Sequence, residues 1–322
     1  MKPKVSFVVT SYNYEGYIGE AIDSLLNQTL KELELIVIDD VSTDGTADVL
    51  ARYESDPRVR VVRHERNMGH IWSHNEGIAL ARGDYVGSID ADDFATRDDA
   101  VARQVALFER YPNVGFVHCA HKVVDSTGRE RSVSQFSDHD LVVDGLDEFT
   151  RLIEFDYVLH SGTLVRRTCL EQLGGYDQRL PNTADWDLWL RIATVSAVGY
   201  VAEPCYAYRV HDNNMSHAKA TPGQAIDENL LVVDRNFALL PPSAAELAAL
   251  WRPARRRALF LQLWYDLSHL RKSRAWRGLA AMLSRSPAVL LDSRFYTSFV
   301  RVLVLTVAGG RAYRRLYGAY SQ

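Results

Sequence analysis

The stretch Tyr85-Val86-Gly87-Ser88-Ile89-Asp90-Ala91-Asp92-Asp93-Phe94 decides the fold. Its first half has the aromatic and β-branched residues of a buried strand, and three carboxylates follow without a Lys or Arg before Arg97. These carboxylates repel one another, and hard divalent cations such as Mg²⁺ or Mn²⁺, which prefer oxygen ligands, relieve that repulsion. A solvated turn followed by a helix cap explains the same residues, because Asp is common at both. The rest of the chain decides between a metal site and a turn.

A regular alternation of strands and helices surrounds this stretch. Apolar β-branched runs predict strands, and apolar residues at helical spacing predict the helices between them. The expected strands are 5–10, 33–39, 59–62 and 85–90, and the expected helices are 18–30, 47–53 and 71–81. Short connections of this kind indicate an α/β fold with parallel strands, which binds ligands at the carboxyl ends of the strands. The polar residues at those ends are Thr10, Tyr12, Asn13, Asp39, Asp40, Asp90, Asp92 and Asp93.

The pattern changes after residue 95. Strand and helix signals are mixed in the next part of the chain, whereas from about Ala225 the chain is mainly helical. Neither a Gly-x-Gly-x-x-Gly nor a Gly-x-x-x-x-Gly-Lys motif is present, which argues against a dinucleotide fingerprint and a P-loop. The expected organisation is a domain over 1–220, with halves 1–95 and 96–220, and a helical C-terminal region over 221–322.

Charge is distributed unevenly along an otherwise ordinary globular composition. From Trp251 onward, fourteen Lys and Arg face two acidic residues, a net of +12 that leaves −16 for the preceding part of a chain whose total is −4. The three cysteines are scattered without metal-type spacing, which is typical of a reduced, intracellular protein. No apolar run reaches the length of a membrane span, and no secretory signal is expected. These features predict a cytoplasmic protein.

Several ordered motifs give the chain a family resemblance over roughly residues 4–215. They are Val5 to Asn13, Ser24 to Thr29, Glu34 to Thr46, Asn67-Met68-Gly69, Ala81 to Asp93, Leu173 to Asp177, Asp185 to Arg191 and Tyr208 to His211. In this order they resemble glycosyltransferase family 2, whose members are inverting enzymes that use nucleotide sugars. The resemblance implies the GT-A fold, a Rossmann-like, mostly parallel central sheet flanked by helices, here with a C-terminal helical extension. It also implies a nucleotide-sugar-binding half over 1–95 and an acceptor half over 96–220.

The family resemblance implies a role for each matching residue. The nucleotide would be bound by Thr10, Tyr12, Asn13, Asp40, Asn67 and Asp90, with Tyr12 stacking on the base and Asp40 accepting from its N3–H. Asp92 and His211 would hold Mn²⁺ or Mg²⁺ at the diphosphate. Asp185 matches the general base, although its usual acidic neighbour is replaced by Ala184, so that Asp187 is an alternative contributor.

Acceptor contacts and alternative functions are less sharply defined. His160, Trp186 and Trp189 are candidate acceptor residues, of which one tryptophan is expected to pack in the core and the other to form a sugar platform. The chemistry fits two separate acidic sites, because a cation stabilises the leaving diphosphate on one side of the sugar while a carboxylate deprotonates the acceptor hydroxyl on the other. The expected acceptor is a glycan or lipid-linked molecule in surface polysaccharide or glycoconjugate synthesis. Alternatives are a nucleotidyltransferase, which would open with a Gly-rich loop that Thr10 to Tyr14 lacks, and a non-catalytic scaffold.

The basic C-terminal region has two interpretations. Its arginines are interleaved with Trp251, Trp264, Trp276, Phe295, Tyr296 and Phe299. They form either the solvated face of a helical bundle or a peripheral contact with the inner face of the membrane, because basic and aromatic amphipathic helices lie in anionic headgroup regions. No motif supports nucleic-acid binding.

Overall fold

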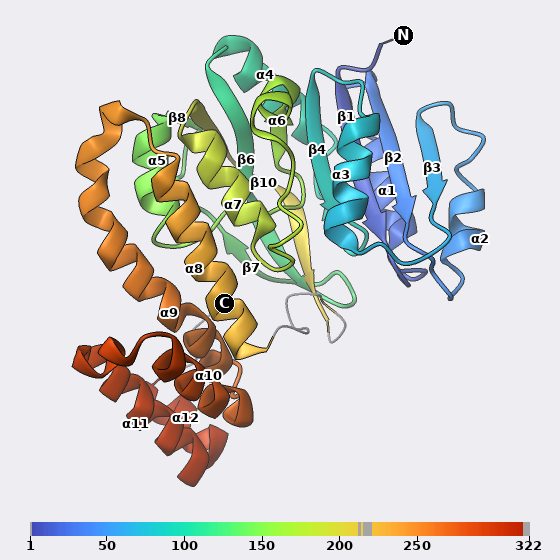
Figure 1. Ribbon diagram of the computed structural model, residues 1–322. Helices are drawn as coiled ribbons and strands as arrows, with labels where there is room; N and C mark the ends of the chain where they lie inside the picture. Colours follow the sequence, from blue (N-terminus) through green and yellow to red (C-terminus); the bar gives the residue numbers. More distant parts are fainter. Residues whose placement is uncertain (1, 212–213, 215–220, 318–322) are drawn as a thin grey trace. The chain divides into compact units, whose positions relative to one another are not determined.

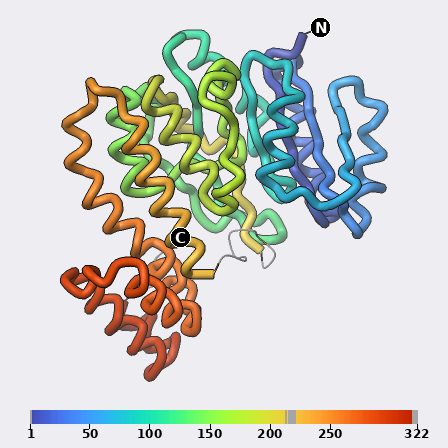
Figure 2. Tube along the Cα trace, in the orientation of Figure 1, coloured from blue at the N-terminus to red at the C-terminus, as the bar shows by residue number. Residues whose placement is uncertain are grey.

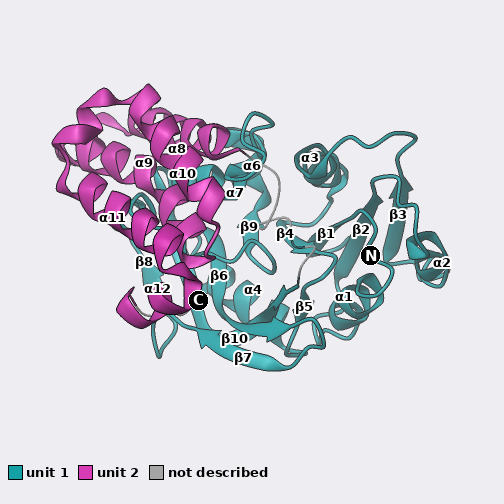
Figure 3. Cartoon of the chain, turned by 90° about the horizontal axis from the view of Figure 1, so that it is seen from below, with its two compact units in different colours: residues 1–214 teal, residues 215–322 magenta. Residues whose placement is uncertain are grey.

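The computed structural model describes residues 2–211, 214 and 221–317, which Figures 1 and 2 show as ribbon and tube. The chain forms two compact units, residues 1–214 and 215–322, coloured separately in Figure 3. The domain boundary is expected after residue 220. Residues 215–220, which immediately precede it, lie outside the described residues. Among the helices that are described, none has the length and apolar character needed to cross a bilayer.

A ten-stranded sheet forms the centre of the first unit. The strands are β1 (Val5–Ser11), β2 (Leu33–Asp39), β3 (Val59–Arg63), β4 (Tyr85–Asp90), β5 (Phe94–Ala95), β6 (Val114–Asp125), β7 (Glu130–Ser134), β8 (Leu141–Val143), β9 (Leu164–Arg166) and β10 (Ala197–Val210). Their order is β3-β2-β1-β4-β9-β6-β10-β5, with β7 beside β6 and β8 beside β10. β1 to β4 are mutually parallel, and β6 and β10 are also parallel, whereas β9 runs antiparallel to both of its neighbours.

The predicted parallel half is confirmed in element order and type. β1 and β2 are buried along their whole length, as expected for strands covered on both faces by helices. In the second half of the sheet, β10 is one long strand, which absorbs the interruption at Pro204 through register shifts against β6.

Helices cover both faces of this sheet (Figure 1). They are α1 (Ile18–Leu26), α2 (Thr46–Ala51), α3 (His70–Leu80), α4 (Ala100–Arg110), α5 (Gly145–Leu152), α6 (Arg167–Leu173) and α7 (Ala184–Ala193). α3 lies directly on β1, because a Cβ added to Gly77 would come within 2.3 Å of Val8 Cγ1. Glycine at this position lets the helix approach the strand closely enough to bring its first turn to the strand's carboxyl end.

The second unit is a helical bundle with its own core. It comprises α8 (Pro222–Ala238), a 3₁₀ segment (Pro242–Leu250), α9 (Trp251–Ser268), α10 (Lys272–Arg285), a second 3₁₀ segment (Pro287–Leu291), α11 (Ser293–Val307) and α12 (Gly309–Tyr317). α9 begins at Trp251, because the preceding segment, which begins at Pro242 directly after Pro241, is a 3₁₀ helix broken at Ala244. Phe260, Leu263 and Met282 lie at the centre of this core.

Candidate active site

The carboxyl ends of β1, β2 and β4 meet at one edge of the sheet, as the strand pattern predicts. β1 pairs with β4 so that Thr10 lies opposite Asp90, and it pairs with β2 so that Ser11 lies opposite Asp39. The Oγ1 atom of Thr10 is 3.2 Å from His74 Nε2 on α3. This edge therefore collects side chains from three strands and one helix.

Asp92 and His211, the two expected metal ligands, are in contact although 119 residues separate them. His211 Nε2 lies 3.0 Å from Asp92 Oδ2, and Asn214 Nδ2 donates to the same oxygen at 3.2 Å. Burial, helped by the charge of Asp90, raises the pKa of Asp92 to about 6. The His211 ring stacks on Tyr17 with ring centroids 5.1 Å apart.

Asp93 completes the acidic group but faces inward. Its Oδ1 accepts a hydrogen bond from the Arg209 backbone N–H at 2.8 Å, which ties the end of β4 to β10. Burial, together with the charges of Asp92 and Asp90, raises its pKa well above the ordinary value. The repulsion expected from the sequence is therefore present in the fold.

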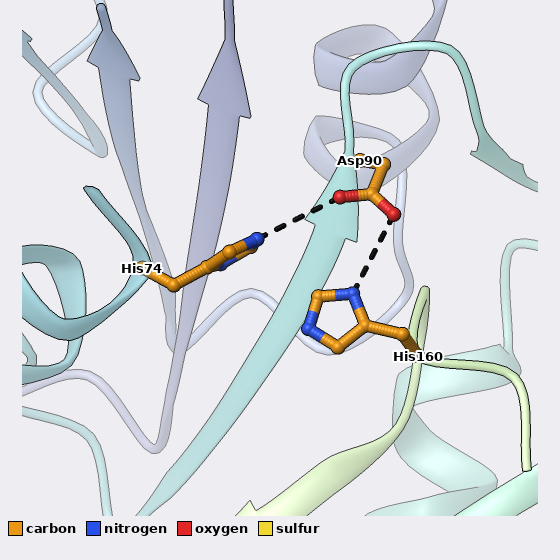
Figure 4. A group of neighbouring side chains, drawn as sticks. All are labelled: His74, Asp90 and His160. Atoms are coloured by element: carbon orange, nitrogen blue, oxygen red, sulfur yellow. Dashed lines mark ion pairs between the residues drawn. The ribbon is translucent and has the colours of Figure 1, made fainter. Parts of the chain in front are cut away.

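Two imidazoles flank Asp90, one at each carboxylate oxygen (Figure 4). His74 Nε2 lies 3.6 Å from Oδ1, and His160 Nδ1 lies 3.5 Å from Oδ2. Burial opposes ionisation of Asp90, but the histidines, His160 first, outweigh it and hold its pKa well below the usual range. Burial lowers the pKa of His74 to about 4, so this ring is neutral near pH 7. The ligand atoms of the three side chains lie within 4.8 Å of one another.

His160 is positioned by a glycine turn rather than by a helix. Gly162 has φ of +86°, and its backbone N–H donates to the Ser88 carbonyl at 2.7 Å. A Cβ at Gly162 would lie 2.3 Å from the Tyr206 ring, so only glycine allows this close approach. Tyr176 Oη, 3.0 Å from His160 Nε2, orients the ring from the other side.

Asp185, the expected general base, lies in the first turn of α7 and is partly buried. Its Oδ1 accepts from the Trp186 backbone N–H at 2.8 Å. Burial raises its pKa; the charge of His160 opposes this rise and that of Asp90 adds to it. Burial and the charge of Asp185 also raise the pKa of Asp156 well above normal. Asp185 is thus within electrostatic reach of the group at the end of β4, and Asp156 supplies a carboxyl neighbour that Ala184 does not.

Asp187, the alternative contributor, has a structural partner. Its Oδ2 accepts from Arg191 Nε at 2.7 Å, and both side chains are buried. The same guanidinium donates to the carbonyls of Leu173, Gly174 and Gly175. Asp187 therefore anchors α7 to the turn that follows α6.

Asp40, the expected reader of the base, belongs to an internal network. Its Oδ1 accepts from the Met68 N–H at 2.7 Å, and its Oδ2 accepts from the Gly69 N–H at 2.8 Å. His64 Nδ1 is 2.7 Å from Oδ1, and the other ring nitrogen is 2.6 Å from Glu76 Oε2. Most of the acceptor capacity of Asp40 is therefore used to hold the turn that opens α3.

The remaining nucleotide candidates lie around the same turns. Asn67 Nδ2 donates to the Asp40 carbonyl at 3.3 Å. Asn13 has φ of +64°, and its Oδ1 accepts from the Thr43 backbone N–H at 2.7 Å, which joins the turns after β1 and β2. Tyr12 beside it is 45 % exposed, so its ring is accessible from solvent.

The expectation that a tryptophan of α7 forms a sugar platform is wrong. Trp186 is 4 % exposed and donates from Nε1 to the Leu152 carbonyl at 2.7 Å. Trp189 is fully buried against Phe116. Neither indole presents a face to solvent, because the apolar side of α7 packs against the sheet.

Sequence reasoning missed His74 and Tyr14. His74 is not among the site residues predicted from the sequence, although His70 and His74 are four apart and share one face of the helix that follows β3. Burial, followed by the charges of Asp92 and Asp90, raises the pKa of Tyr14. The spacing of the two histidines was the available signal; nothing local marked Tyr14.

Comparison with known proteins identifies the family. The family model "Glycosyl transferase family 2" matches residues 6–174. The teichuronic acid biosynthesis glycosyltransferase TuaG of Bacillus subtilis, described as putative, is 31 % identical over 229 residues, covering 68 % of this chain and 83 % of TuaG. Hyaluronan synthase of Pasteurella multocida and chondroitin synthase of Escherichia coli are each 28 % identical over 67 % of this chain, which spans only 21 % and 30 % of their lengths.

Solved structures show the same fold at lower sequence identity. S. aureus TarS 1-349 in complex with UDP-GlcNAc matches with a TM-score of 0.70 at 19 % identity, covering 98 % of this chain and 91 % of that one. Mannosyltransferase PcManGT from Pyrobaculum calidifontis, in complex with GDP-Man and Mn²⁺, matches with a TM-score of 0.57 at 21 % identity, covering 98 % and 88 %. The expected GT-A architecture with a helical C-terminal region is confirmed, and the chain belongs to glycosyltransferase family 2.

Proposed function

We propose that the chain transfers a sugar, with inversion, from a UDP-linked donor to a hydroxyl of a glycan or lipid-linked acceptor in surface polysaccharide synthesis. The observation that carries this proposal is that two acidic groups from distant parts of the chain lie within electrostatic range of each other. Asp92 contacts His211 at the end of β4, and Asp185 on α7 interacts electrostatically with Asp90 and His160. This arrangement supports a donor side formed by residues 1–95 and an acceptor side formed by 96–220.

The donors around Asp92 fit a divalent cation. Carboxylate oxygen and imidazole nitrogen are ligands that Mn²⁺ accepts, and those of Asp92 and His211 are 3.0 Å apart. The raised pKa of Asp92 has burial and the neighbouring Asp90 charge as its causes, and a cation offsets both. Mn²⁺ or Mg²⁺ bound there supplies positive charge that stabilises a leaving diphosphate.

The chain's own residues would perform the other steps. The exposed Tyr12 ring would stack on the base, and the half-exposed Asp90 carboxylate would accept from the ribose. Asp185 would take the proton of the attacking hydroxyl, and its raised pKa suits a base that works close to neutral pH. Because the Asp40 carboxylate accepts hydrogen bonds from within the chain, we assign it to stabilising the turn beside the base and not solely to binding the base.

A second set of potential metal ligands lies at the same edge of the sheet. His74, Asp90 and His160 also have the ligand types and proximity of a transition-metal site. Manganese binding followed by electron paramagnetic resonance separates the two sites. We expect Asp92→Asn to weaken Mn²⁺ binding and His74→Gln to leave it nearly unchanged; the reverse result assigns the cation to the histidine pair.

The transfer reaction is tested by UDP release from a panel of UDP-sugars with Mn²⁺. We expect slow release by the unmodified chain, and Asp185→Asn to lower kcat by about 10²–10⁴-fold, the usual contribution of a general base. Asp147→Asn is the matched control, because Asp147 is also an acidic residue in a first helical turn but is exposed on α5. Normal turnover by Asp185→Asn removes Asp185 as the base, and GDP-sugar use in place of UDP-sugar use corrects the donor.

A further inference from the structure

The outer face of α11 is apolar and exposed. Its residues are Tyr296, Phe299, Val300, Leu303 and Val307, which are between 39 % and 78 % exposed. Their spacing of three and four places all five on one side of the helix. The opposite side, with Phe295, Val302 and Leu305, is buried in the core of the second unit. α11 therefore packs one side into the core and exposes a second apolar stripe on its outer side.

The arrangement is unusual for a helix at the surface of a globular protein. Exposed apolar residues are normally scattered singly, whereas a contiguous patch marks a contact with a partner or a membrane. Leu291, which ends the 3₁₀ segment immediately before α11, is 91 % exposed and adds to the apolar surface at this end.

The helix that follows is basic on its exposed side. Arg311, Arg314 and Arg315 lie on one face of α12, and Tyr313 on the other face is buried. The sequence from 293 to the end contains no Asp or Glu. The two acidic residues after residue 250 already have arginine partners, since Asp266 pairs with Arg274 at 2.9 Å and Asp292 pairs with Arg294 at 2.8 Å.

We propose that the α11 outer face and the basic face of α12 bind the surface of an anionic lipid bilayer. Apolar and aromatic side chains enter the boundary between headgroups and acyl chains, while arginines attract anionic headgroups. A second copy of the chain is a poorer occupant, because it would bring a region of net charge +12 against another of the same charge. Binding to a bilayer is additional to the proposed transfer reaction and does not depend on the identity of the sugar donor or the metal.

The structure also corrects which residues make the membrane contact expected from the sequence. Phe295 is buried, and Trp264 and Trp276 pack against the core of the second unit, where Trp276 Nε1 donates to Thr306 Oγ1 at 2.9 Å. Arg255 pairs with Asp234 at 2.9 Å. The surface suited to lipid is therefore further along the chain than the arginine run at 255–257.

Flotation of the full chain with vesicles tests the proposal. We expect binding to phosphatidylcholine vesicles that contain phosphatidylglycerol and much weaker binding to phosphatidylcholine alone. The double variant Leu303→Glu/Val307→Glu should lower partitioning at least tenfold. The triple variant Arg311→Gln/Arg314→Gln/Arg315→Gln should lower it roughly a hundredfold at low salt, from the usual contribution of each basic residue near an anionic surface.

The controls separate lipid binding from folding and self-association. Leu239→Glu is the matched control, because Leu239 is a 49 % exposed leucine in the same unit but outside α11, and it should bind like the unmodified chain. Thermal melting should show all variants folded, and UDP release in solution should be unaffected by the α11 variants. Failure of the unmodified chain to bind anionic vesicles overturns the proposal. So does full binding by folded Leu303→Glu/Val307→Glu, or a dimer in sedimentation that the same substitutions abolish.

Discussion

Two carboxylate–histidine networks lie at the ends of β2 and β4, on either side of β1, and they differ in how completely their hydrogen bonds are made within the chain. In the first, Asp40 and Glu76 share the two nitrogens of His64 at 2.7 and 2.6 Å. In the second, His74 and His160 flank the two oxygens of Asp90 at the looser distances of 3.6 and 3.5 Å. The Asp40 side chain is 6 % exposed, whereas the Asp90 side chain is 44 % exposed.

The difference indicates which network is structural and which is open to a ligand. The Asp40 carboxylate also accepts two backbone N–H groups, so its hydrogen bonds are made within the chain. Asp90 keeps acceptor capacity on a half-exposed carboxylate whose ionisation the histidines favour. A carboxylate that is ionised, partly accessible and incompletely bonded is suited to binding a sugar donor or a metal, whereas a saturated buried carboxylate is suited to holding a turn.

The largest expected effect is on stability, from Asp40→Asn. This change removes the negative charge that His64 and two backbone donors share, and loss of one member of a buried ionic network costs about 3–5 kcal/mol. Urea unfolding measures the loss, with Asp48→Asn on the exposed face of α2 as the control. A variant that unfolds like the unmodified chain but binds UDP weakly would show that Asp40 reads the base instead of holding the turn.

Asp90→Asn should have the opposite profile. The fold should persist, because the side chain is half-exposed and its polar partners, the Ser161 hydroxyl and the two imidazoles, lie at 3.4–3.6 Å. UDP release should fall roughly 10–100-fold, as for residues that support a metal or diphosphate site. Asp84→Asn, at the exposed start of the same strand region, is the matched control. If Asp90→Asn unfolds as readily as Asp40→Asn, the contrast between the two networks is lost.

The sequence was sufficient for the parallel half of the fold and for most of the residues at its edge. Strands of β-branched residues that end in polar residues predict both the sheet and the face that binds ligands, so Thr10, Asp90 and Asp92 were placed together correctly. The contact between Asp92 and His211 followed from the family resemblance rather than from any local pattern, because 119 residues separate them.

What the sequence could not predict is the direction in which individual side chains point. The local sequence around Trp186 and Trp189 does not distinguish a core tryptophan from one that stacks on a sugar. Both indoles are buried because α7 packs against the sheet. His74 is inconspicuous until Gly77 brings α3 onto β1 and the turn at Gly162 brings His160 to the other side of Asp90. Tertiary packing determines these side-chain directions, and residue propensity and spacing carry no information about that packing.

A smaller effect, on the pH dependence of stability, tests the same comparison. Burial of His64 opposes protonation, but hydrogen bonds to Asp40 and Glu76 outweigh it and raise its pKa above the ordinary value of about 6.5. Protonation therefore stabilises the fold; this stabilisation is complete below the unfolded pKa and is lost as pH rises through the folded pKa. His64→Gln should flatten that decline in urea midpoints across the pH range, whereas exposed His139→Gln should not. Parallel curves for His64→Gln and the unmodified chain would contradict the ionic role of His64.

The smallest effect concerns the open network and the base across from it. Burial raises the pKa of Asp185, and the His160 charge opposes that rise while Asp90 adds to it. His160→Gln removes the opposing charge, so the acid limb of kcat/KM should move to higher pH, by up to about 1 unit for a close charge partner. Rates well above that limb should approach those of the unmodified chain, since a deprotonated Asp185 needs no further help. A uniform loss of rate at every pH with an unmoved limb would mean that His160 only positions Asp90. The two networks would then still differ in exposure and in hydrogen-bond distances, but the Asp90 network would have no electrostatic link to the proton transfer.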